Sequence, residues 1–343
     1  MRSSRFDGPH LPNCNTWIFW KGIEKLSSDL YNMHKRTKQR NVVRAVLAWY
    51  TRYGRTLPWR TIARGAVRTN AAYRILLSEV MLQQTQVSRV LEQYPRFLRR
   101  FPTVRSLAKA KRSEVVRAWQ GMGYNNRAVR LHECAHLIVS RFGGKVPNRR
   151  DDLLALPGIG EYTADAILSS VYGVPVAAVD VNVQRVLSRI FWKMPTMATV
   201  QSRTDVTVLA QTLLPKHHAY EWNQALMDLG ATVCTARQPH CTLCPAETWC
   251  ASRNSMAHTS LRRRKSEAGI DGVPNRIYRG RVIEHLRLRR RSVRADILAN
   301  RVHPRFSRRH VAWFTRLLAG LEKDGLLRLR GNGSLATMYV SFA

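Results

Sequence analysis

Apolar residues recur every three or four positions from about residue 39 to residue 233, and this period limits the fold more than any other sequence feature. Short connectors that contain glycine or proline divide the region into segments such as VVRAVLAWYTRY. No stretch alternates between apolar and polar residues as a half-buried strand does. The pattern therefore predicts a mainly α-helical core.

The composition changes along the chain and predicts five consecutive regions. These are a basic, flexible extension (1–38), the helical core (39–233), a cysteine loop (234–250), a polar linker (251–275) and a small C-terminal module (276–343). The module has helical periodicity near Ile277–Arg287, Val293–Asn300 and His310–Lys323, and a hairpin signal at Gly331–Ser334. Three helices and a hairpin predict a winged-helix-like module, which either binds DNA or packs on its neighbour.

The chain is strongly basic, with 57 lysine and arginine residues against 22 aspartate and glutamate residues and a formal charge of +35. A polyanion such as DNA is the expected partner, because basic side chains that neutralise phosphates release counterions. An anionic membrane surface or a general bias toward arginine would also produce this charge. No apolar stretch reaches the roughly 20 residues of a membrane span, and no signal-peptide core is present, so we expect a cytoplasmic, nucleoid-associated protein.

Four of the six cysteines lie in one short segment, CTARQPHCTLCPAETWC, with the spacing C-x6-C-x2-C-x5-C. Four thiolates suit either zinc or an iron–sulfur cluster, and the chemistry of sulfur alone does not separate the two. The expected ligands are Cys234, Cys241, Cys244 and Cys250. In both cases the metal would hold a basic loop in place.

The sequence Leu156-Pro157-Gly158-Ile159-Gly160 lies between two helical segments. Two glycines in a tight turn before a helix leave backbone N–H groups free to hold a phosphate, which the helix dipole also favours. The pattern is typical of a helix-hairpin-helix turn. An ordinary connector between two helices would use glycine in the same way.

Two carboxylates interrupt apolar runs. Glu79 lies within ILLSEVML on a helix that must be largely buried, and Asp180 follows VAAV and opens the next helix. An apolar wall favours the neutral form of a carboxyl group, which can then act as a general acid near neutral pH. Two such groups suit cleavage of a glycosidic bond through an oxocarbenium-like state. A buried ion pair for Glu79 and a helix N-cap for Asp180 are the structural alternatives.

Six blocks occur in an order that resembles one family. They are LPWR, LSEVMLQQTQV, GMGYNNRA, LPGIGEYTADAI, VDVNVQRVLSR and the cysteine loop. Together they resemble the helix-hairpin-helix/Gly-Pro-Asp DNA glycosylases, and most closely the MutY-type adenine DNA glycosylases. The resemblance implies a two-lobed helical fold with a [4Fe–4S] cluster on the four cysteines.

The resemblance also implies roles for individual residues. Glu79 resembles the acid that protonates the leaving adenine, Asp180 the carboxylate that stabilises positive charge on the sugar, and Asn182 a residue that supports Asp180. Tyr162 stands where lyase-competent relatives carry a lysine, and a phenol cannot form a Schiff base. The DNA-binding and base-binding positions are Trp59, Arg60, Leu82, Gln84, Tyr124, Leu156, Gly158 and Gly160.

The resemblance implies a monofunctional base-excision repair enzyme that flips adenine from a mispair with 8-oxoguanine or guanine in duplex DNA. Because a single flipped base needs no two-fold symmetry, we expect a monomer. Two features depart from the family pattern. Residues 251–343 lack the Nudix-like domain that many members carry, and GYNN replaces the more common GYY. A thymine or uracil glycosylase acting on G:T or G:U, and a non-catalytic DNA-binding regulator, are the alternatives.

Overall fold

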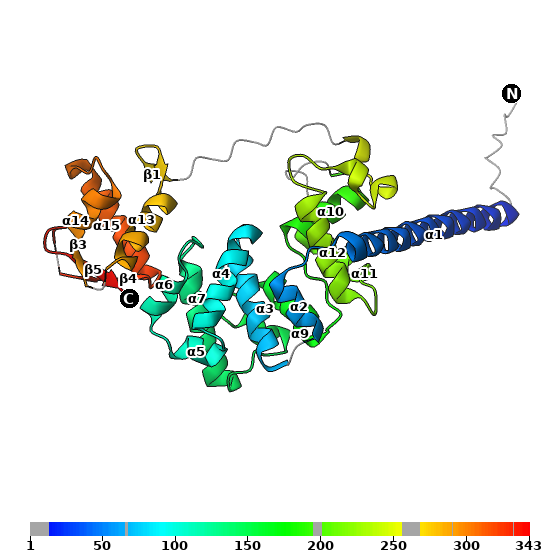
Figure 1. Cartoon of the computed structure of the whole chain (residues 1–343). Coiled ribbons are helices and arrows are strands. Elements are labelled where there is room, and N and C mark those ends of the chain that lie inside the picture. Colours follow the sequence, from blue (N-terminus) through cyan, green and yellow to red (C-terminus); the bar gives the residue numbers. More distant parts are fainter. Residues whose placement is uncertain (1–13, 66–67, 195–200, 256–267, 290, 332) are drawn as a thin grey trace, which may run out of the picture. The chain divides into compact units, whose positions relative to one another are not determined.

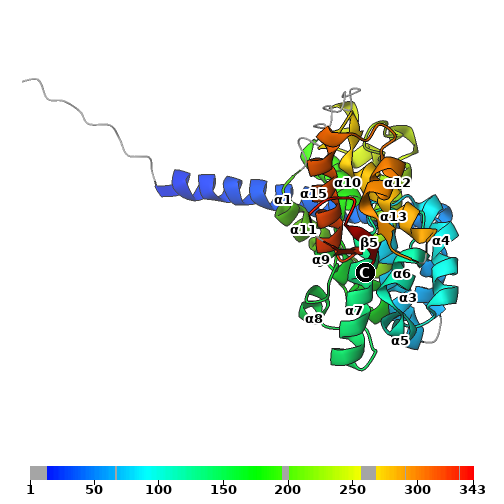
Figure 2. The same cartoon turned by 90° about the vertical axis from the view of Figure 1, so that its left-hand side faces the viewer.

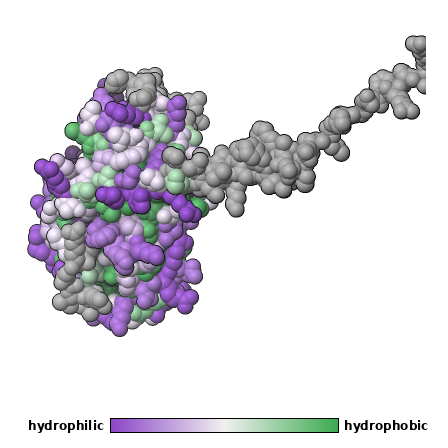
Figure 3. Space-filling view, turned by 90° about the vertical axis from the view of Figure 1, so that its right-hand side faces the viewer, coloured by the Kyte–Doolittle hydropathy of each residue, from purple (hydrophilic) through white to green (hydrophobic). Residues whose placement is uncertain are grey.

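The computed structural model describes residues 14–65, 68–194, 201–255, 268–289, 291–331 and 333–343. These residues are mainly helical, as the periodicity predicts, and short strands occur only after residue 268 within the described ranges. No described helix has both the length and the apolar character that a membrane span requires. Hydrophilic residues cover most of the face drawn in Figure 3, with apolar residues scattered among them.

The chain divides into two units, each made of segments that are separated in the sequence. The first unit comprises residues 1–54, 181–215 and 224–258, and the second comprises residues 55–180, 216–223 and 259–343. The expected core of residues 39–233 is therefore shared between both units. Sequence periodicity cannot reveal such a division, because it reports which residues are buried and not what covers them.

The first unit contains α1 (Cys14–Tyr53), α10 (Val181–Trp192), α11 (Arg203–Thr212), most of α12 (Ala219–Thr232), and the short 3-10 turns η2 (Cys241–Leu243), η3 (Glu247–Trp249) and η4 (Arg253–Ser255). Helix α1 corrects the expected extension, because residues 14–38 continue the helix that was predicted to begin at about residue 39. The long blue helix is visible in Figures 1 and 2. Residues 1–13 lie outside the described part of the chain.

The second unit begins with eight helices, which carry the candidate site. They are α2 (Pro58–Gly65), α3 (Arg68–Leu82), α4 (Val87–Arg100), α5 (Val104–Lys109), α6 (Arg112–Ala118), α7 (Asn126–Phe142), α8 (Arg150–Leu154) and α9 (Glu161–Tyr172). Helix α3 packs against α2, α4, α7 and α9. From Ala71 to Met81 every residue of α3 except Arg74 is buried. A helix that is covered on all sides is the centre of the core and not an amphipathic surface element.

The C-terminal module contains β1 (Gly269–Ile270), β2 (Val273–Pro274), α13 (Asn275–Arg287), β3 (Val293–Arg294), α14 (Ala295–Val302), η5 (Arg308–His310), α15 (Val311–Lys323), β4 (Leu327–Arg330) and β5 (Tyr339–Phe342). The β1–β2 hairpin forms a separate two-stranded sheet, and the antiparallel three-stranded sheet has the order β3-β5-β4. The predicted helices and hairpin are therefore present. Strand β3 is added, and β1 and β2 correct the expected linker (251–275), since they form a hairpin at its end. Residues 256–267 of the expected linker lie outside the described part of the chain.

Two arginines join the module to the rest of the second unit. Arg287 is buried and donates hydrogen bonds to the carbonyl of Val116 (3.0 Å) and to Oδ1 of Asn125 (2.8 Å). Arg117 on α6 donates in the opposite direction, to the carbonyl of Arg289 (2.7 Å). Hydrogen bonds from charged donors are among the stronger ones, so these contacts fix α13 against α6.

Candidate active site

Glu79 lies near the C-terminal end of α3, three residues before Leu82, and is only 8% exposed. Its position follows from the apolar run around it, because the helix is buried on every side. Burial raises the pKa of this carboxyl group from 4.5 to about 7. The charge of Asp180 acts in the same direction, whereas a hydrogen bond from Tyr162 and the charge of Arg60 lower the pKa. Near pH 7, Glu79 is therefore present in both protonation states.

Tyr162 and Asp180 lie beside Glu79, although 101 residues of sequence separate Glu79 from Asp180. Tyr162 is in the first turn of α9, and its hydroxyl donates a hydrogen bond to the Glu79 carboxylate. Burial and the charges of Glu79 and Asp180 raise the pKa of Tyr162 well above its usual value, so the phenol stays protonated. The structure thus brings two carboxylates, a phenol and the buried guanidinium of Arg60 together.

Asn223 is a residue of this region that the sequence analysis missed. It is 3% exposed, and its Oδ1 accepts the backbone N–H of Ala178 (3.1 Å). Its Nδ2 donates to the carbonyl of Val176 (2.9 Å) and to Oγ of Ser169 (3.0 Å). One amide therefore fixes the extended segment that leads to Asp180 against α9. The available signal was an asparagine directly after Trp222 in the helical segment EWNQALM.

Arg127 is a second residue that the sequence analysis missed, and it joins two loops. Its guanidinium is buried and donates to the carbonyls of Val80 and Met81 (both 2.9 Å) at the C-terminal end of α3. It also donates to the carbonyl of Met122 (3.0 Å) and to Oγ1 of Thr85 (2.8 Å). A positive charge suits the C-terminal end of a helix, although burial lowers the pKa of Arg127 to about 10.

The two loops that Arg127 joins carry Gln84 and Tyr124, both of which are exposed. Both residues have positive φ angles, 56° for Gln84 and 41° for Tyr124. Non-glycine residues rarely adopt this conformation, and it persists where the surroundings enforce it, often at functional sites. Arg127 holds both loops, through its hydrogen bonds to Thr85 in one and Met122 in the other.

The Leu156–Gly160 turn connects α8 to α9, as expected for a helix-hairpin-helix element. Gly158 has φ 82°, and an added Cβ there would lie 3.2 Å from Cβ of Arg130. Gly160 precedes α9, and an added Cβ there would meet nothing within 4 Å, so open space faces the N-terminal end of α9. Arg150 holds the two helices together through two hydrogen bonds to buried Asp165 (2.7 and 3.2 Å).

Trp59 and Leu82, predicted to bind the base, and Leu156, predicted in the turn, differ in exposure. Trp59 is buried, and its ring meets that of Tyr94 edge-on at 5.4 Å. Leu156 is also buried, whereas Leu82 is half-buried beside the core. Trp59 and Leu156 therefore shape the surroundings of the site from within the core.

The four clustered cysteines line one pocket of the first unit, together with Val186, Leu229 and Arg189. All four are free thiols. Arg189 is 2% exposed, and its Nη1 lies within hydrogen-bond distance of Sγ of Cys234 (3.4 Å) while it donates to the carbonyl of Thr235 (2.7 Å). A buried cation that donates to sulfur fits an anionic metal–thiolate centre.

Asn182 lies in the first unit, at the start of α10. Its Oδ1 accepts a hydrogen bond from Arg185 (2.9 Å), which also donates to the carbonyls of Gly230 (2.6 Å) and Cys234 (2.9 Å). The structure therefore connects Asn182 with the start of the cysteine loop, a link that the sequence did not suggest.

The chain is similar in sequence and fold to known proteins. Residues 77–211 match the HhH-GPD superfamily of base excision DNA repair proteins. An adenine DNA glycosylase of Mycobacterium tuberculosis (strain H37Rv) is 40% identical over 303 residues, which cover 85% of this chain and 91% of that protein. A solved structure of a thermostable thymine-DNA glycosylase is 29% identical with a TM-score of 0.58, covering 64% of this chain and 99% of the other.

Endonuclease III, in a non-covalent complex with DNA, has the same fold at 22% identity, with a TM-score of 0.53 over 63% of this chain and 95% of that one. The relationship to the Mycobacterium tuberculosis enzyme extends over most of both chains. The chain therefore belongs to the adenine DNA glycosylase family within the HhH-GPD superfamily.

Proposed function

We propose that this protein is a monofunctional DNA glycosylase of base excision repair, which hydrolyses the N-glycosidic bond of adenine mispaired with 8-oxoguanine or guanine. The observation that carries the proposal is the buried carboxyl group of Glu79, with a pKa of about 7, beside Asp180 and Tyr162. Membership of the adenine DNA glycosylase family supports adenine as the base.

Glu79 supplies the proton that the leaving base requires. A purine anion is a poor leaving group, so a positioned acid accelerates departure, and such an acid works best when its pKa lies near the working pH. Burial gives Glu79 that pKa. After the proton is transferred, the Glu79 carboxylate can accept a proton from the attacking water, as the second step requires.

Asp180 stabilises the positive charge that develops on the deoxyribose as the bond breaks. Tyr162 holds the Glu79 carboxylate through its hydroxyl and stays protonated, so it neither attacks the sugar nor forms a Schiff base. Strand cleavage therefore requires a later treatment such as alkali.

Exposed backbone and side chains would bind the duplex around the flipped base. The open N-terminal end of α9 beyond Gly160 suits a phosphate. Gln84 and Tyr124, held by Arg127, are the side chains that would fill the space the flipped base leaves. We propose that the enzyme is a monomer and that it associates with genomic DNA.

A [4Fe–4S] cluster is the cofactor that the cysteine pocket would hold. Cys234, Cys241, Cys244 and Cys250 would be its ligands, since four thiols converge on one pocket and Arg189 donates a hydrogen bond to sulfur there. The bound cluster would supply no step of the hydrolysis and would fix the loop that contains Arg237.

A single-turnover assay on duplexes with A:8-oxoguanine, A:G, T:G and U:G tests the proposed function, each with and without alkali. We expect release of free adenine from the first two duplexes, with strand cleavage only after alkali. The ratio of the first two rates measures how strongly 8-oxoguanine is recognised.

Thymine excision is the second candidate, because the thermostable thymine-DNA glycosylase is the solved structure with the higher TM-score of the two compared. Activity restricted to T:G and U:G would establish it. Inactivity on all four duplexes, with DNA binding retained, would favour a regulator.

A further inference from the structure

The C-terminal module has the complete topology of a winged helix. Its elements follow the order α13, β3, α14, α15, β4, β5, and its sheet has the order β3-β5-β4. In this arrangement α14 and α15 form the helix-turn-helix pair, and β4 with β5 forms the wing. The hairpin carries glycine at its tip, where Gly331 has φ 92° and an added Cβ would lie 2.2 Å from the carbonyl of Thr337.

The module is basic, and its few acidic groups are occupied. Residues 276–343 contain 16 arginine and lysine residues but only four aspartate and glutamate residues. Asp296 pairs with Arg294 (2.9 Å) and Asp324 with Arg279. Glu284 pairs with Arg287, and Glu322 accepts the backbone N–H of Leu329 (2.7 Å). The excess positive charge is therefore not neutralised within the module.

Part of that excess lies at α15 and the segment before it. Arg305, Arg308 and Arg316 are exposed, and none forms an ion pair with any described residue. The buried face of α15 holds Trp313, Phe314, Leu317, Leu318 and Leu321. Its opposite face exposes Val311, Ala312, Arg316 and Ala319. Small side chains let this helix approach a surface closely, and they offer few hydrogen bonds with which to read bases.

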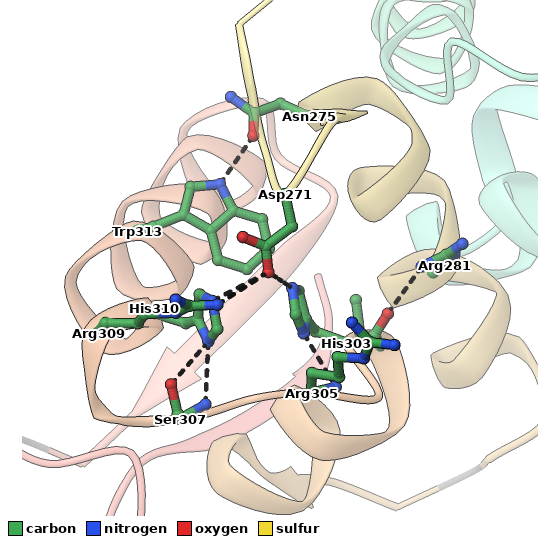
Figure 4. A network of polar contacts seen from close by, with 10 residues as sticks. Asp271, Asn275, Arg281, His303, Arg305, Ser307, Arg309, His310 and Trp313 are labelled. Carbon is green, nitrogen blue, oxygen red and sulfur yellow. Dashed lines mark hydrogen bonds and ion pairs between the residues drawn. The ribbon is translucent and has the colours of Figure 1, made fainter.

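A polar network around two buried histidines fixes the segment that precedes α15 (Figure 4). Oδ2 of Asp271, in the β1–β2 turn, lies 3.1 Å from Nε2 of His303 and 3.2 Å from Nε2 of His310. Nδ1 of His303 accepts the backbone N–H of Arg305 (3.2 Å), and Nδ1 of His310 accepts that of Ser307 (3.0 Å). Both histidines are almost fully buried.

The same three side chains could be mistaken for a metal site, because their ligand atoms lie within 4.8 Å of one another. However, both Nδ1 atoms accept backbone N–H groups, and Nε2 of His310 accepts a hydrogen bond from Nε of Arg309 (3.1 Å), so a cationic side chain already occupies one of the ligand atoms. The guanidinium of Arg309, 3.7 Å from Asp271, adds positive charge at this point. The cluster therefore acts as an anchor that presents the 305–309 segment in one conformation.

From these observations we propose that the winged-helix module is a second duplex-binding surface, on which Arg305, Arg308 and Arg316 bind DNA backbone phosphates while α15 lies in a groove. The proposal rests on the proposed function for the nature of the ligand, duplex DNA. The surface contributes affinity without sequence preference, because phosphate contacts carry no sequence information.

The test compares charge-reversal variants of the full-length protein, purified with its cofactor. The double variant Arg308→Glu/Arg316→Glu changes the proposed surface. The double variant Arg96→Glu/Arg99→Glu changes two exposed arginines of α4 and produces the same net charge. Binding to a lesion-free 30-base-pair duplex is measured by fluorescence anisotropy over a range of salt concentrations, and circular dichroism establishes that both variants are folded.

Loss of two phosphate contacts should reduce the slope of log K against log salt by about 2 and raise Kd roughly tenfold or more in the Arg308/Arg316 variant alone. An unchanged Kd, or an equal loss in the α4 control, would overturn the proposal. Single-turnover base release at saturating enzyme distinguishes this outcome from failure of the proposed function. It should be normal in both variants, whereas a wild-type protein that binds duplex but releases no base would contradict only the proposed function.

Discussion

Replacing Glu79 by glutamine should stabilise the fold at high pH while it removes the proposed general acid. The carboxyl group has a pKa of about 7 in the folded protein against 4.5 in the unfolded chain, chiefly because α3 buries it. The folded state therefore holds its proton more tightly than the unfolded state. Between pH 4.5 and 7 the wild-type protein loses stability as pH rises, because the charged form is disfavoured in the core.

The size of the effect follows from the pKa difference. One pKa unit corresponds to about 1.4 kcal/mol, so full ionisation of Glu79 costs the folded state about 3 kcal/mol. Between pH 5 and pH 8 the cost grows by about 2.5 kcal/mol. Glutamine has nearly the same shape but does not ionise, so the variant avoids this cost, and other titrating groups cancel in the comparison.

Urea unfolding of wild-type protein and of Glu79→Gln at pH 5, 6, 7 and 8 measures this difference. The free energy of unfolding of the variant minus that of the wild type should increase by about 2.5 kcal/mol from pH 5 to pH 8. Glu92→Gln on exposed α4 is the matched control and should show no such trend. A pH-independent difference for Glu79→Gln would refute the claim that Glu79 is a carboxyl group destabilised by burial.

Three further predictions concern the surroundings of Glu79. In Tyr162→Phe the loss of the donated hydrogen bond should raise the pKa of Glu79 further, so the alkaline limb of the single-turnover pH profile should move to higher pH; a move to lower pH would contradict this. Asn223→Ala should lower the free energy of unfolding by roughly 1–3 kcal/mol and slow base release, because the backbone groups of Val176 and Ala178 lose their hydrogen-bond partner. Urea unfolding measures the first effect and single-turnover rates measure the second. Arg127→Met should destabilise by roughly 3 kcal/mol or more and weaken duplex binding, since several carbonyls lose one donor; Arg130→Met, at an exposed position of the same helix, is the control.

Much of the fold was predictable from the sequence, since the helical period reports burial directly. The helical core, the turn before α9 and the C-terminal helices with their hairpin are confirmed. The predicted beginning of the first helix, at about residue 39, was wrong. Residues 14–38 are polar and basic and lack the apolar period that marks a packed helix, but they are helical. The division into two units was also missed, since it depends on contacts between distant segments.

The site was predictable only through the matched motifs. Burial of Glu79 follows from the apolar residues around it, but its proximity to Asp180 and Tyr162 depends on the packing of α3 against α9. Arg127 and Asn223 were missed because their importance lies in which backbone groups they reach across the fold. The assigned catalytic and DNA-binding roles stay predictions.

In the proposed function, Glu79 and Asp180 together cleave the bond between adenine and its sugar. Single-turnover release of adenine from an A:8-oxoguanine duplex by wild-type protein, Glu79→Gln and Asp180→Asn tests it most directly, with binding to the same duplex measured in parallel. We expect rapid release by the wild type and a loss of roughly 100-fold or more in each variant, with binding retained. Wild-type rates in both variants would contradict the proposed catalytic roles of Glu79 and Asp180.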